Sequence, residues 1–402
     1  MVIIGGGASG MMAALSAGRQ GYKTLLIEKN NKLGKKILAT GNGRCNFTNV
    51  FASSKDYNSD FVLGALSVLS VKDTLKLFDD LGLMKLEEGQ GRCYPASEQA
   101  QSIMDVIEEE LKRLKVEILY EKEVRLVTKN NGLFKLDFTD SSSLISKNVI
   151  VATGGISLPQ SGSTGDGYTI AKTFGHSITS LVPSLTRLKL KHQYLNEMSG
   201  VRFTNNLKLI SDNQVIDEVY DDVIFNKTGI SGLGILSLSK QANFSVNANK
   251  KTTVVVRLVD SNQETLLKRF NRLSYKTVFN GLVGLINKKL IIPVLEEAGI
   301  KNYNRAVSSL NKQEVKKLIK ILLGFEFEVI GSDGFDDAQV TSGGVNLEEV
   351  NKTTLESLLV EGLYFTGEVL DIDGKSGGYN LQWAWSSGFL AGLLKKEIDK
   401  NV

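Results

Sequence analysis

The first 28 residues constrain the fold more than any other stretch of the chain. Residues 2–4 are apolar without polar alternation, as in a strand that is buried on both faces. A G-x-G-x-x-G motif occupies Gly5 to Gly10, helical periodicity follows it, and a second apolar run at 24–27 ends at Glu28. Because strand, glycine turn, helix, strand and terminal acid come in this order, they predict a Rossmann-like βαβ unit that binds an adenine dinucleotide.

The three motif glycines have separate roles in such a unit. Gly5 allows the tight turn, Gly7 leaves room for a pyrophosphate beside the backbone, and Gly10 lets the helix pack close to the strand. The Glu28 carboxylate can accept hydrogen bonds from both ribose hydroxyls of a dinucleotide, and it would repel a phosphate there. A plain βαβ unit whose glycines serve only packing is the alternative that these residues leave open.

The overall composition narrows the classes of partner. At 402 residues the chain is long enough for two or three domains, and its composition is that of an ordinary globular protein. Its 48 basic and 44 acidic residues leave a net charge of +4, which is too balanced to indicate a nucleic-acid footprint. We therefore expect no nucleic-acid partner. A membrane partner is not expected either, because no segment has the apolar length of a span and the N-terminus lacks the basic start of a signal peptide.

Cysteine and histidine usage argues against a metal or disulfide framework. Cys45 and Cys93 lie far apart and form no C-x-x-C motif, so they indicate neither a zinc site nor a disulfide, and a cytoplasmic location fits best. With only His176 and His192 and no H-E-x-x-H motif, no metal site is expected. We expect His176 to cap the helix that ends just before it, because a protonated imidazole is favoured at a helix C-terminus.

Further glycine-marked segments recur far along the chain. One runs from Gly41 to Asn49, a second covers 152–155 and the loop 162–167, and a third covers 367–368 and the loop 371–380. Glycines at strand ends and helix starts let a ligand approach the backbone. One extended cofactor explains three such returns better than three unrelated turns do.

The pattern of predicted elements divides the chain into four segments. Residues 1–185 form the first part of the dinucleotide-binding domain, and residues 330–402 complete it. Residues 186–260 are mostly strand-like and form an inserted β domain, while residues 261–329 form a helical and basic inserted part.

Within the first segment, periodicity gives a coarse assignment of elements. It predicts helices in the regions 60–82 and 97–115. Residues 116–139 are interpreted as three short strands of a small antiparallel insertion, with a hairpin turn at Asn130-Asn131-Gly132.

Two segments are specific enough to indicate a family: G-N-G-R-C-N-x-T-N at 41–49 and G-G-Y-N-L-Q-W-A at 377–384. Together with the N-terminal motif they resemble the BaiN/YhiN-like bacterial flavoproteins over nearly the whole chain. The resemblance implies an α/β fold with non-covalent FAD. Its parts would be a Rossmann-like FAD-binding domain of the two-dinucleotide-binding type and an inserted β-barrel plus helical domain.

FAD stays bound and needs contacts along its length, whereas the nicotinamide of NAD must leave. We expect the N-terminal motif to hold the diphosphate, Glu28 the adenosine ribose, Gly367 and Glu368 the ribityl chain, and the helix start at 377–380 the flavin pyrimidine edge. The residues expected to contact FAD are Gly5, Gly7, Ala8, Ser9, Gly10, Glu28, Lys29, Lys36, Gly41, Asn42, Gly43, Arg44, Cys45, Asn46, Thr153, Gly154, Gly155, Gly165, Asp166, Gly367, Glu368, Gly377, Gly378, Tyr379 and Asn380.

Three residues are candidates for catalysis. Arg44 could hold an anionic or carbonyl substrate or clamp the cofactor, and Tyr379 could orient the reacting groups. Cys45 could react with the flavin, and an inert small buried residue is its alternative role.

These observations predict an FAD-dependent oxidoreductase that transfers a hydride between the flavin and a small metabolite bound beside the insertion. From the resemblance, we expect an oxidase of small amines such as aminoacetone that produces hydrogen peroxide. The first competing hypothesis is an NAD(P)H-dependent reductase of activated double bonds, so O2 or NAD(P)H would be the second substrate. A non-enzymatic flavin sensor is the next hypothesis. A flavin-dependent RNA modifier is the last, and the near-neutral charge argues against it. The oligomeric state stays open.

Overall fold

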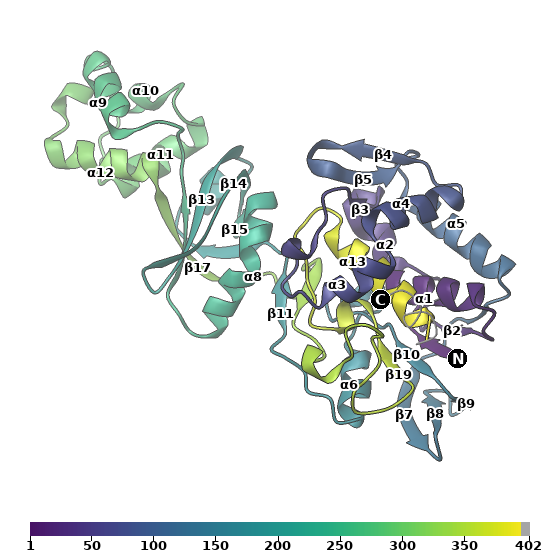
Figure 1. Cartoon of the computed structure of the whole chain (residues 1–402). Coiled ribbons are helices and arrows are strands. Elements are labelled where there is room, and N and C mark those ends of the chain that lie inside the picture. Colours follow the sequence, from purple (N-terminus) through teal and green to yellow (C-terminus); the bar gives the residue numbers. More distant parts are fainter. Residues whose placement is uncertain (395–402) are drawn as a thin grey trace. The chain divides into compact units, whose positions relative to one another are not determined.

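The chain divides into two units, each with its own hydrophobic core (Figure 1). The structure, a computed structural model, describes residues 1–394. The first unit comprises residues 1–182 and the described chain from residue 340 onward, and the second comprises Pro183–Gln339. The chain therefore leaves the first unit once and returns to it once.

A five-stranded parallel sheet forms the centre of the first unit. Its strand order is β19-β10-β1-β2-β6. The three adjacent strands β19, β10 and β1 are buried at every position, which explains why their sequences are apolar without alternation. The strands are β1 (Val2–Ile4), β2 (Leu25–Ile27), β6 (Glu117–Leu119), β10 (Val149–Val151) and β19 (Leu363–Phe365).

Two helices of this unit pack unusually close together because small residues line their contact. A Cβ added at Gly388 would lie 2.2 Å from the carbonyl oxygen of Ser9, and one at Gly392 would lie 2.5 Å from that of Ala13. The helices are α1 (Ala8–Arg19) and α13 (Tyr379–Gly392), which lie side by side although they come from opposite ends of the described chain (Figure 1).

The remaining elements of this unit surround the parallel sheet. The helices are α2 (Lys35–Ala39), α3 (Val62–Val68), α4 (Val71–Asp80), α5 (Ala100–Arg113) and α6 (Asp166–Thr173). The strands outside the central sheet are β3 (Thr48–Asn49), β4 (Lys85–Glu88), β5 (Arg92–Pro95), β7 (Val124–Asn130), β8 (Leu133–Phe138), β9 (Ser143–Ser146) and β18 (Val340–Ser342). The strand β11 (Val182–Ser184) begins with the last residue of this stretch of the unit and continues into the second unit. The 3-10 helices are η1 (Thr40–Gly43), η2 (Ser54–Asp56), η3 (Gly89–Gly91), η4 (Pro159–Ser161), η6 (Leu347–Glu349) and η7 (Gly367–Val369).

Two predictions within the first segment need correction. The helical region 60–82 is two helices, because Ser70 and Asp73 form a capping box that starts α4. The antiparallel sheet is β7-β8-β9, whereas Glu117–Leu119 pairs in parallel with β2 at the edge of the central sheet. A three-residue run carries too little pattern to reveal its partner, so only the tertiary pairing assigns it.

The second unit is a closed barrel with a group of helices. The strand order is β12-β15-β14-β13-β16-β17, and inward residues alternate with outward ones, most clearly along β17. The strands are β12 (Leu188–Lys191), β13 (Arg202–Ser211), β14 (Gln214–Asn226), β15 (Gly229–Ser231), β16 (Thr252–Val256) and β17 (Phe325–Ser332). The helices are α7 (Leu195–Met198), α8 (Leu233–Asn247), α9 (Gln263–Arg272), α10 (Val278–Leu282), α11 (Lys288–Glu297), η5 (Val307–Ser309) and α12 (Lys312–Leu323).

The internal boundaries of this unit differ from the expected ones. The expected β segment 186–260 contains the helix α8, and the expected helical segment 261–329 runs into β17, which pairs with β12 and β16. The unit ends at Gln339, so the return near residue 330 falls within the last barrel strand. Residues 395–402 of the expected final segment lie outside the described residues.

Candidate functional site

The candidate site lies along the carboxyl edge of the parallel sheet. The strands β1, β2, β10 and β19 all end there, because neighbouring parallel strands end at the same edge. The segments that follow them begin with Gly5, Glu28, Ala152 and Thr366. In open α/β sheets, ligands bind outside this edge.

The three motif glycines differ in what surrounds them. Gly5 has φ +104°, and a Cβ there would lie 2.5 Å from the carbonyl oxygen of Ala152. A Cβ on Gly10 would lie 1.9 Å from the carbonyl oxygen of Gly5, whereas a Cβ on Gly7 would meet nothing within 4 Å. The protein's own packing thus requires Gly5 and Gly10, while the space beside Gly7 stays open to a ligand.

Glu28 is buried at the end of β2, and its carboxylate is fixed by neighbouring donors. Its Oε2 accepts from the Gly6 N–H at 2.8 Å, and its Oε1 accepts from the Asn30 N–H at 2.8 Å. The Asn30 amide donates to Oε1 as well, at 2.7 Å. Each carboxylate oxygen can accept more than one hydrogen bond, so the fixed group can also receive ribose hydroxyls.

Lys29 joins the segment after β2 to the start of α6. Its Nζ lies 2.6 Å from Asp166 Oδ2 and 2.5 Å from Thr164 Oγ1. The predicted residues Lys29, Gly165 and Asp166 therefore meet, although 135 residues of sequence separate Lys29 from Thr164.

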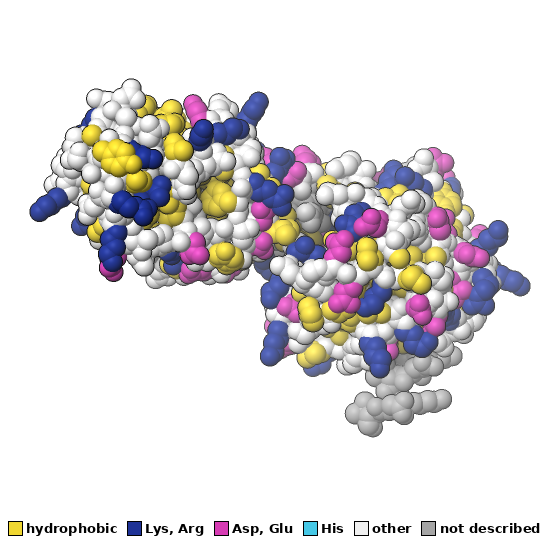
Figure 2. Space-filling view, turned by 90° about the horizontal axis from the view of Figure 1, so that it is seen from above, with side chains coloured by type: hydrophobic (Ala, Val, Ile, Leu, Met, Phe, Trp, Pro, Cys, Tyr) yellow, Lys and Arg dark blue, Asp and Glu magenta, His cyan; other side chains and the backbone are white. Residues whose placement is uncertain are grey.

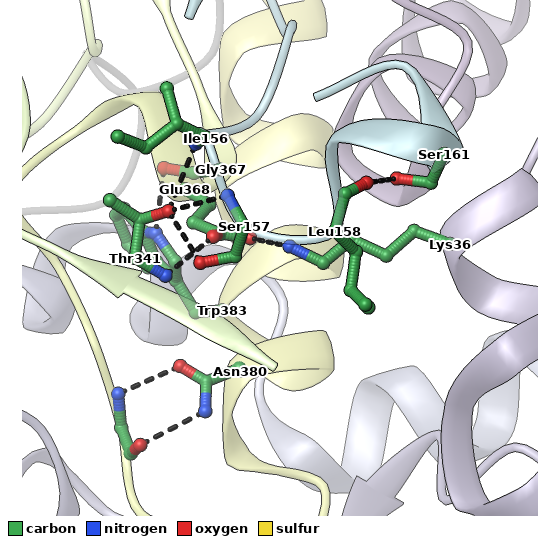
Figure 3. A network of polar contacts seen from close by, with 11 residues as sticks. Lys36, Ile156, Ser157, Leu158, Ser161, Thr341, Gly367, Glu368, Asn380 and Trp383 are labelled. Atoms are coloured by element: carbon green, nitrogen blue, oxygen red, sulfur yellow. Dashed lines mark hydrogen bonds and ion pairs between the residues drawn. The ribbon is translucent and has the colours of Figure 1, made fainter. Parts of the chain in front are cut away.

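A network around Glu368 links three predicted segments (Figure 3). Glu368 accepts from Lys36 Nζ at 2.7 Å and from the Thr341 N–H at 2.8 Å. The hydroxyl of Thr341 in turn accepts from the N–H groups of Ile156 at 2.9 Å and Ser157 at 3.0 Å. Thr341 is a site residue that the sequence did not predict, and the T-S-G-G run that it begins was the available signal.

At Gly367 the third glycine segment packs closely against the N-terminal motif. Gly367 has φ +75°, and a Cβ there would lie 2.5 Å from Ser9 Oγ. Its N–H donates to Ser387 Oγ at 3.0 Å, and its carbonyl accepts from Trp383 Nε1 at 3.1 Å. Residues 9 and 367, far apart in sequence, are therefore in contact at the sheet edge.

A second cluster joins the Gly41 to Asn49 segment to the start of α13. Asn49 Nδ2 donates to the Gly377 carbonyl at 3.0 Å, and a Cβ on Gly378 would lie 2.5 Å from the carbonyl oxygen of Thr48. The Asn380 amide bridges both backbone groups of Gly374, so it shapes the loop before α13 (Figure 3). By contrast, Gly41, Asn42 and Gly43 are exposed.

Several buried polar atoms at these segments have no hydrogen-bond partner among residues 1–394. They include Asn46 Oδ1, Thr153 Oγ1 and Thr366 Oγ1. Buried polar groups are nearly always paired in native proteins, so unpartnered atoms on these segments indicate a polar ligand. Together with the open space beside Gly7, these atoms fit a dinucleotide such as FAD.

The three catalytic candidates differ in their surroundings. Cys45 is fully buried, and burial raises the pKa of its thiol to about 12 despite a hydrogen bond with Thr40, so it stays protonated and unreactive. Arg44 pairs with Glu88 and Glu98 and lies 4.3 Å from the centre of the Tyr94 ring.

Tyr379 is only partly buried. Burial, and then the charge of Asp56, raise the pKa of its hydroxyl. The neighbouring Tyr57 donates a hydrogen bond to the Tyr379 carbonyl at 2.9 Å and meets its ring edge-on. Tyr379 therefore holds a proton at neutral pH close to the start of α13.

Neither a metal cluster nor a membrane span occurs in the described part of the chain. No group of three or more His, Cys, Asp or Glu residues within 1–394 could hold a metal ion. None of the helices in this range is both long enough and apolar enough to cross a membrane.

Comparison with known proteins gives matches over nearly the whole chain. The family described as HI0933-like protein Rossmann domain matches residues 1–394. A 3-dehydro-bile acid delta(4,6)-reductase of Clostridium scindens is 36% identical, covering 98% of each chain. A ribosomal RNA dihydrouridine synthase of Haemophilus influenzae is 33% identical, covering 98% of this chain and 97% of that protein.

One solved structure supports the fold alone. It is a 3-ketosteroid delta1-dehydrogenase from Sterolibacterium denitrificans, with a TM-score of 0.51 at 11% identity, covering 97% of this chain and 98% of that one.

Proposed function

The chain belongs to the HI0933-like family, which confirms its resemblance to the BaiN/YhiN-like flavoproteins, and we propose that it is an FAD-dependent oxidoreductase. The assignment of FAD as cofactor is supported by the open space beside Gly7 together with the unpartnered buried polar atoms of Asn46, Thr153 and Thr366. The residues proposed to hold FAD are those of the N-terminal motif, Glu28 and the segments that meet around Glu368 and Gly378. FAD, when bound, supplies hydride chemistry that side chains lack.

The proposed reaction is reduction of a C=C bond conjugated to a carbonyl. The names of both relatives describe this chemistry, since a dihydrouridine arises when the conjugated double bond of a uracil is reduced. One hydride and one proton add across the bond, and NAD(P)H supplies the electron pair and becomes NAD(P)+. Oxidation of small amines such as aminoacetone, the first expectation from sequence, has no support from these relatives.

The side chains and backbone of the protein bind the substrate, orient it and donate the proton. We assign the proton to the hydroxyl of Tyr379, because Cys45 is buried and inert while Arg44 is engaged by two carboxylates. The first N–H groups of α13, after Gly378, have no partner within the helix and carry the positive end of its dipole. They are suited to stabilise negative charge that develops nearby.

The reaction is tested with FAD-reconstituted protein under anaerobic conditions. With NADH or NADPH and cyclohexenone as a probe, we expect consumption of the reduced nicotinamide and formation of the saturated ketone. Peroxide production from aminoacetone in air, without turnover of the enone, would overturn the proposal. Protein that takes up no FAD would overturn the cofactor assignment.

Tyr379→Phe tests the assigned proton donor. We expect the rate of enone reduction to fall about 10²-fold to 10⁴-fold, the usual contribution of general acid catalysis, with FAD content unchanged. Tyr57→Phe is the matched control, because it removes a hydroxyl from the adjacent ring and should keep most of the rate. Equal rates for both variants would remove Tyr379 from the mechanism.

The substrate whose double bond is reduced can be a small molecule or an RNA, so the expectation about nucleic acid has to be revised. The expected exclusion of nucleic acid has no support, because the H. influenzae relative and an Escherichia coli protein that is 32% identical over 96% of each chain are named ribosomal RNA dihydrouridine synthases. RNA is therefore the second candidate substrate beside a small enone.

A further inference from the structure

The positive charge of the chain is concentrated in one segment. Residues 261–324 contain twelve Lys and Arg residues but only four Asp and Glu residues. Their net charge of +8 is twice that of the whole chain, so the remainder is net acidic. The net charge of the whole chain conceals this separation, and a local surplus of this size is the electrostatic pattern that a polyanionic partner requires.

Part of this charge surrounds a hollow of about 900 Å³ in the second unit. Arg202 on β13 lines it together with Lys268, Arg269 and Arg272 on α9. Asp260 is the acid among its lining residues. The space-filling view of this unit shows Lys and Arg side chains interspersed with hydrophobic ones (Figure 2).

The basic side chains of the hollow are available to a ligand to different degrees. Arg269 Nη2 donates to the carbonyls of Gly281 and Val283, each at 3.3 Å, while its Nε is buried without a partner in the described chain. Lys268 forms an exposed pair with Glu264, which contributes little stability and is readily exchanged. Arg272 is exposed and forms no ion pair among residues 1–394.

Apolar residues also line the hollow, so it suits a flat ring next to an anion. Phe203, Leu258 and Leu285 contribute apolar surface, and Phe203 is only partly buried. Bases of a single strand stack on aromatic side chains while Lys and Arg contact the phosphates.

A second hollow of about 660 Å³ extends the same basic character. It is lined by Lys208 on β13 and by Lys316, Lys317 and Lys320 on α12. Both hollows include residues of β13 and α9, although they have no lining residue in common.

We propose that the hollow lined by Arg202, Lys268, Arg269 and Arg272 binds the phosphodiester backbone of a single-stranded RNA segment. This inference rests on the proposed function in one respect: reduction of a uracil explains why the protein would bind RNA. The binding surface itself follows from charge, cavity and the unpartnered guanidinium nitrogen.

The test measures binding of a fluorescein-labelled single-stranded RNA oligonucleotide to the FAD-reconstituted full chain over a range of salt concentrations. Lys268→Gln/Arg272→Gln removes two phosphate contacts without disturbing Arg269, which holds backbone carbonyls. For single strands each contact contributes about 0.7 to the slope of log K against log salt, so we expect the slope to become shallower by about 1.4. The dissociation constant should rise accordingly.

Lys227→Gln/Lys250→Gln is the matched control, because it removes two exposed charges from the same unit outside both hollows. It should bind like wild type, and the unfolding midpoints of both variants should agree with wild type. Equal losses in the two variants, no loss in either, or no salt-dependent binding by wild type would overturn the proposal. So would displacement of the RNA by an equimolar small amphipathic anion such as cholate.

The readouts separate this proposal from the proposed function. Wild-type protein that binds RNA as described but reduces no enone or uracil contradicts the reaction alone. Wild-type protein that reduces cyclohexenone but binds RNA through neither hollow contradicts the binding surface alone.

Discussion

The glycines of the N-terminal motif are the same type of residue but have different structural roles. Gly10 lies against the backbone of Gly5, so a side chain there must displace the helix from the strand. Gly7 faces open space, so the folded protein tolerates a side chain there and only a ligand would meet it. The atoms around each glycine, rather than the motif as a whole, show which glycine is needed for packing and which leaves space for a ligand.

Alanine at Gly10 should therefore affect stability, whereas alanine at Gly7 should affect cofactor binding. Gly10→Ala should destabilise the first unit by about 1–3 kcal/mol, as overpacking usually does, and should be detected by urea unfolding of the cofactor-free protein. Gly7→Ala should leave that unfolding curve unchanged but weaken FAD binding in a fluorescence titration. Normal FAD affinity in Gly7→Ala would contradict the assignment of the diphosphate to this turn.

Thr341 contributes one hydroxyl to two backbone donors. Thr341→Val should leave the N–H groups of Ile156 and Ser157 without their acceptor. A buried donor left unsatisfied costs about 1–3 kcal/mol, and thermal unfolding of the first unit should show a loss of that size. Thr341→Ser keeps the hydroxyl and should retain most of the stability; equal losses in both variants would assign the effect to packing.

At the scale of elements, the end of α6 shows why a local pattern can mislead. The backbone N–H of His176 donates to the Ala171 carbonyl and so does terminate the helix. The ring, however, is buried between Glu349, at 3.2 Å from Nδ1, and Ser357, at 2.8 Å from Nε2. The prediction that His176 caps the helix as a cation is therefore wrong, because its imidazole is buried and forms hydrogen bonds with Glu349 and Ser357.

This burial makes stability depend on pH. Burial lowers the pKa of His176, and the charge of Glu349 only partly opposes it. The unfolded chain therefore binds a proton that the folded chain resists, so the free energy of unfolding should fall as the pH drops below about 6.5. His176→Gln should show a shallower decline of the first unit's unfolding midpoint between about pH 7.5 and pH 5.5. An identical slope in wild type and variant would exclude this residue as the cause.

At the scale of the whole molecule, the two units have separate cores. One core gathers around the parallel sheet and its helices, and the other fills the barrel and its helical part. All residues proposed to hold FAD belong to the first unit, whereas the proposed RNA surface belongs to the second.

Calorimetry of the full chain should therefore resolve two unfolding transitions. FAD at about 100 times its dissociation constant should stabilise the first unit by about 2.7 kcal/mol and shift only the transition that His176→Gln also alters. The RNA oligonucleotide should shift the other one. A single transition that both ligands shift together would contradict two independently stable units.

The sequence by itself determined the local features of this protein. An apolar run followed by G-x-G-x-x-G and an acid dictates a strand, a turn and a helix whose geometry is largely independent of the rest of the chain. The same local chemistry predicted the glycine segments at 152–155 and 367–368, and the family motifs indicated FAD.

Tertiary structure decided every property that depends on partners distant in sequence. It placed Glu117–Leu119 in the parallel sheet, gave Glu368 and Thr341 their joint network, and buried the ring of His176. It also brought Arg202 of β13 into one hollow with the basic residues of α9, which follow it by more than sixty positions. Strand pairing, burial and surface charge arise from contacts across hundreds of residues, and a local pattern carries no information about which contacts those will be.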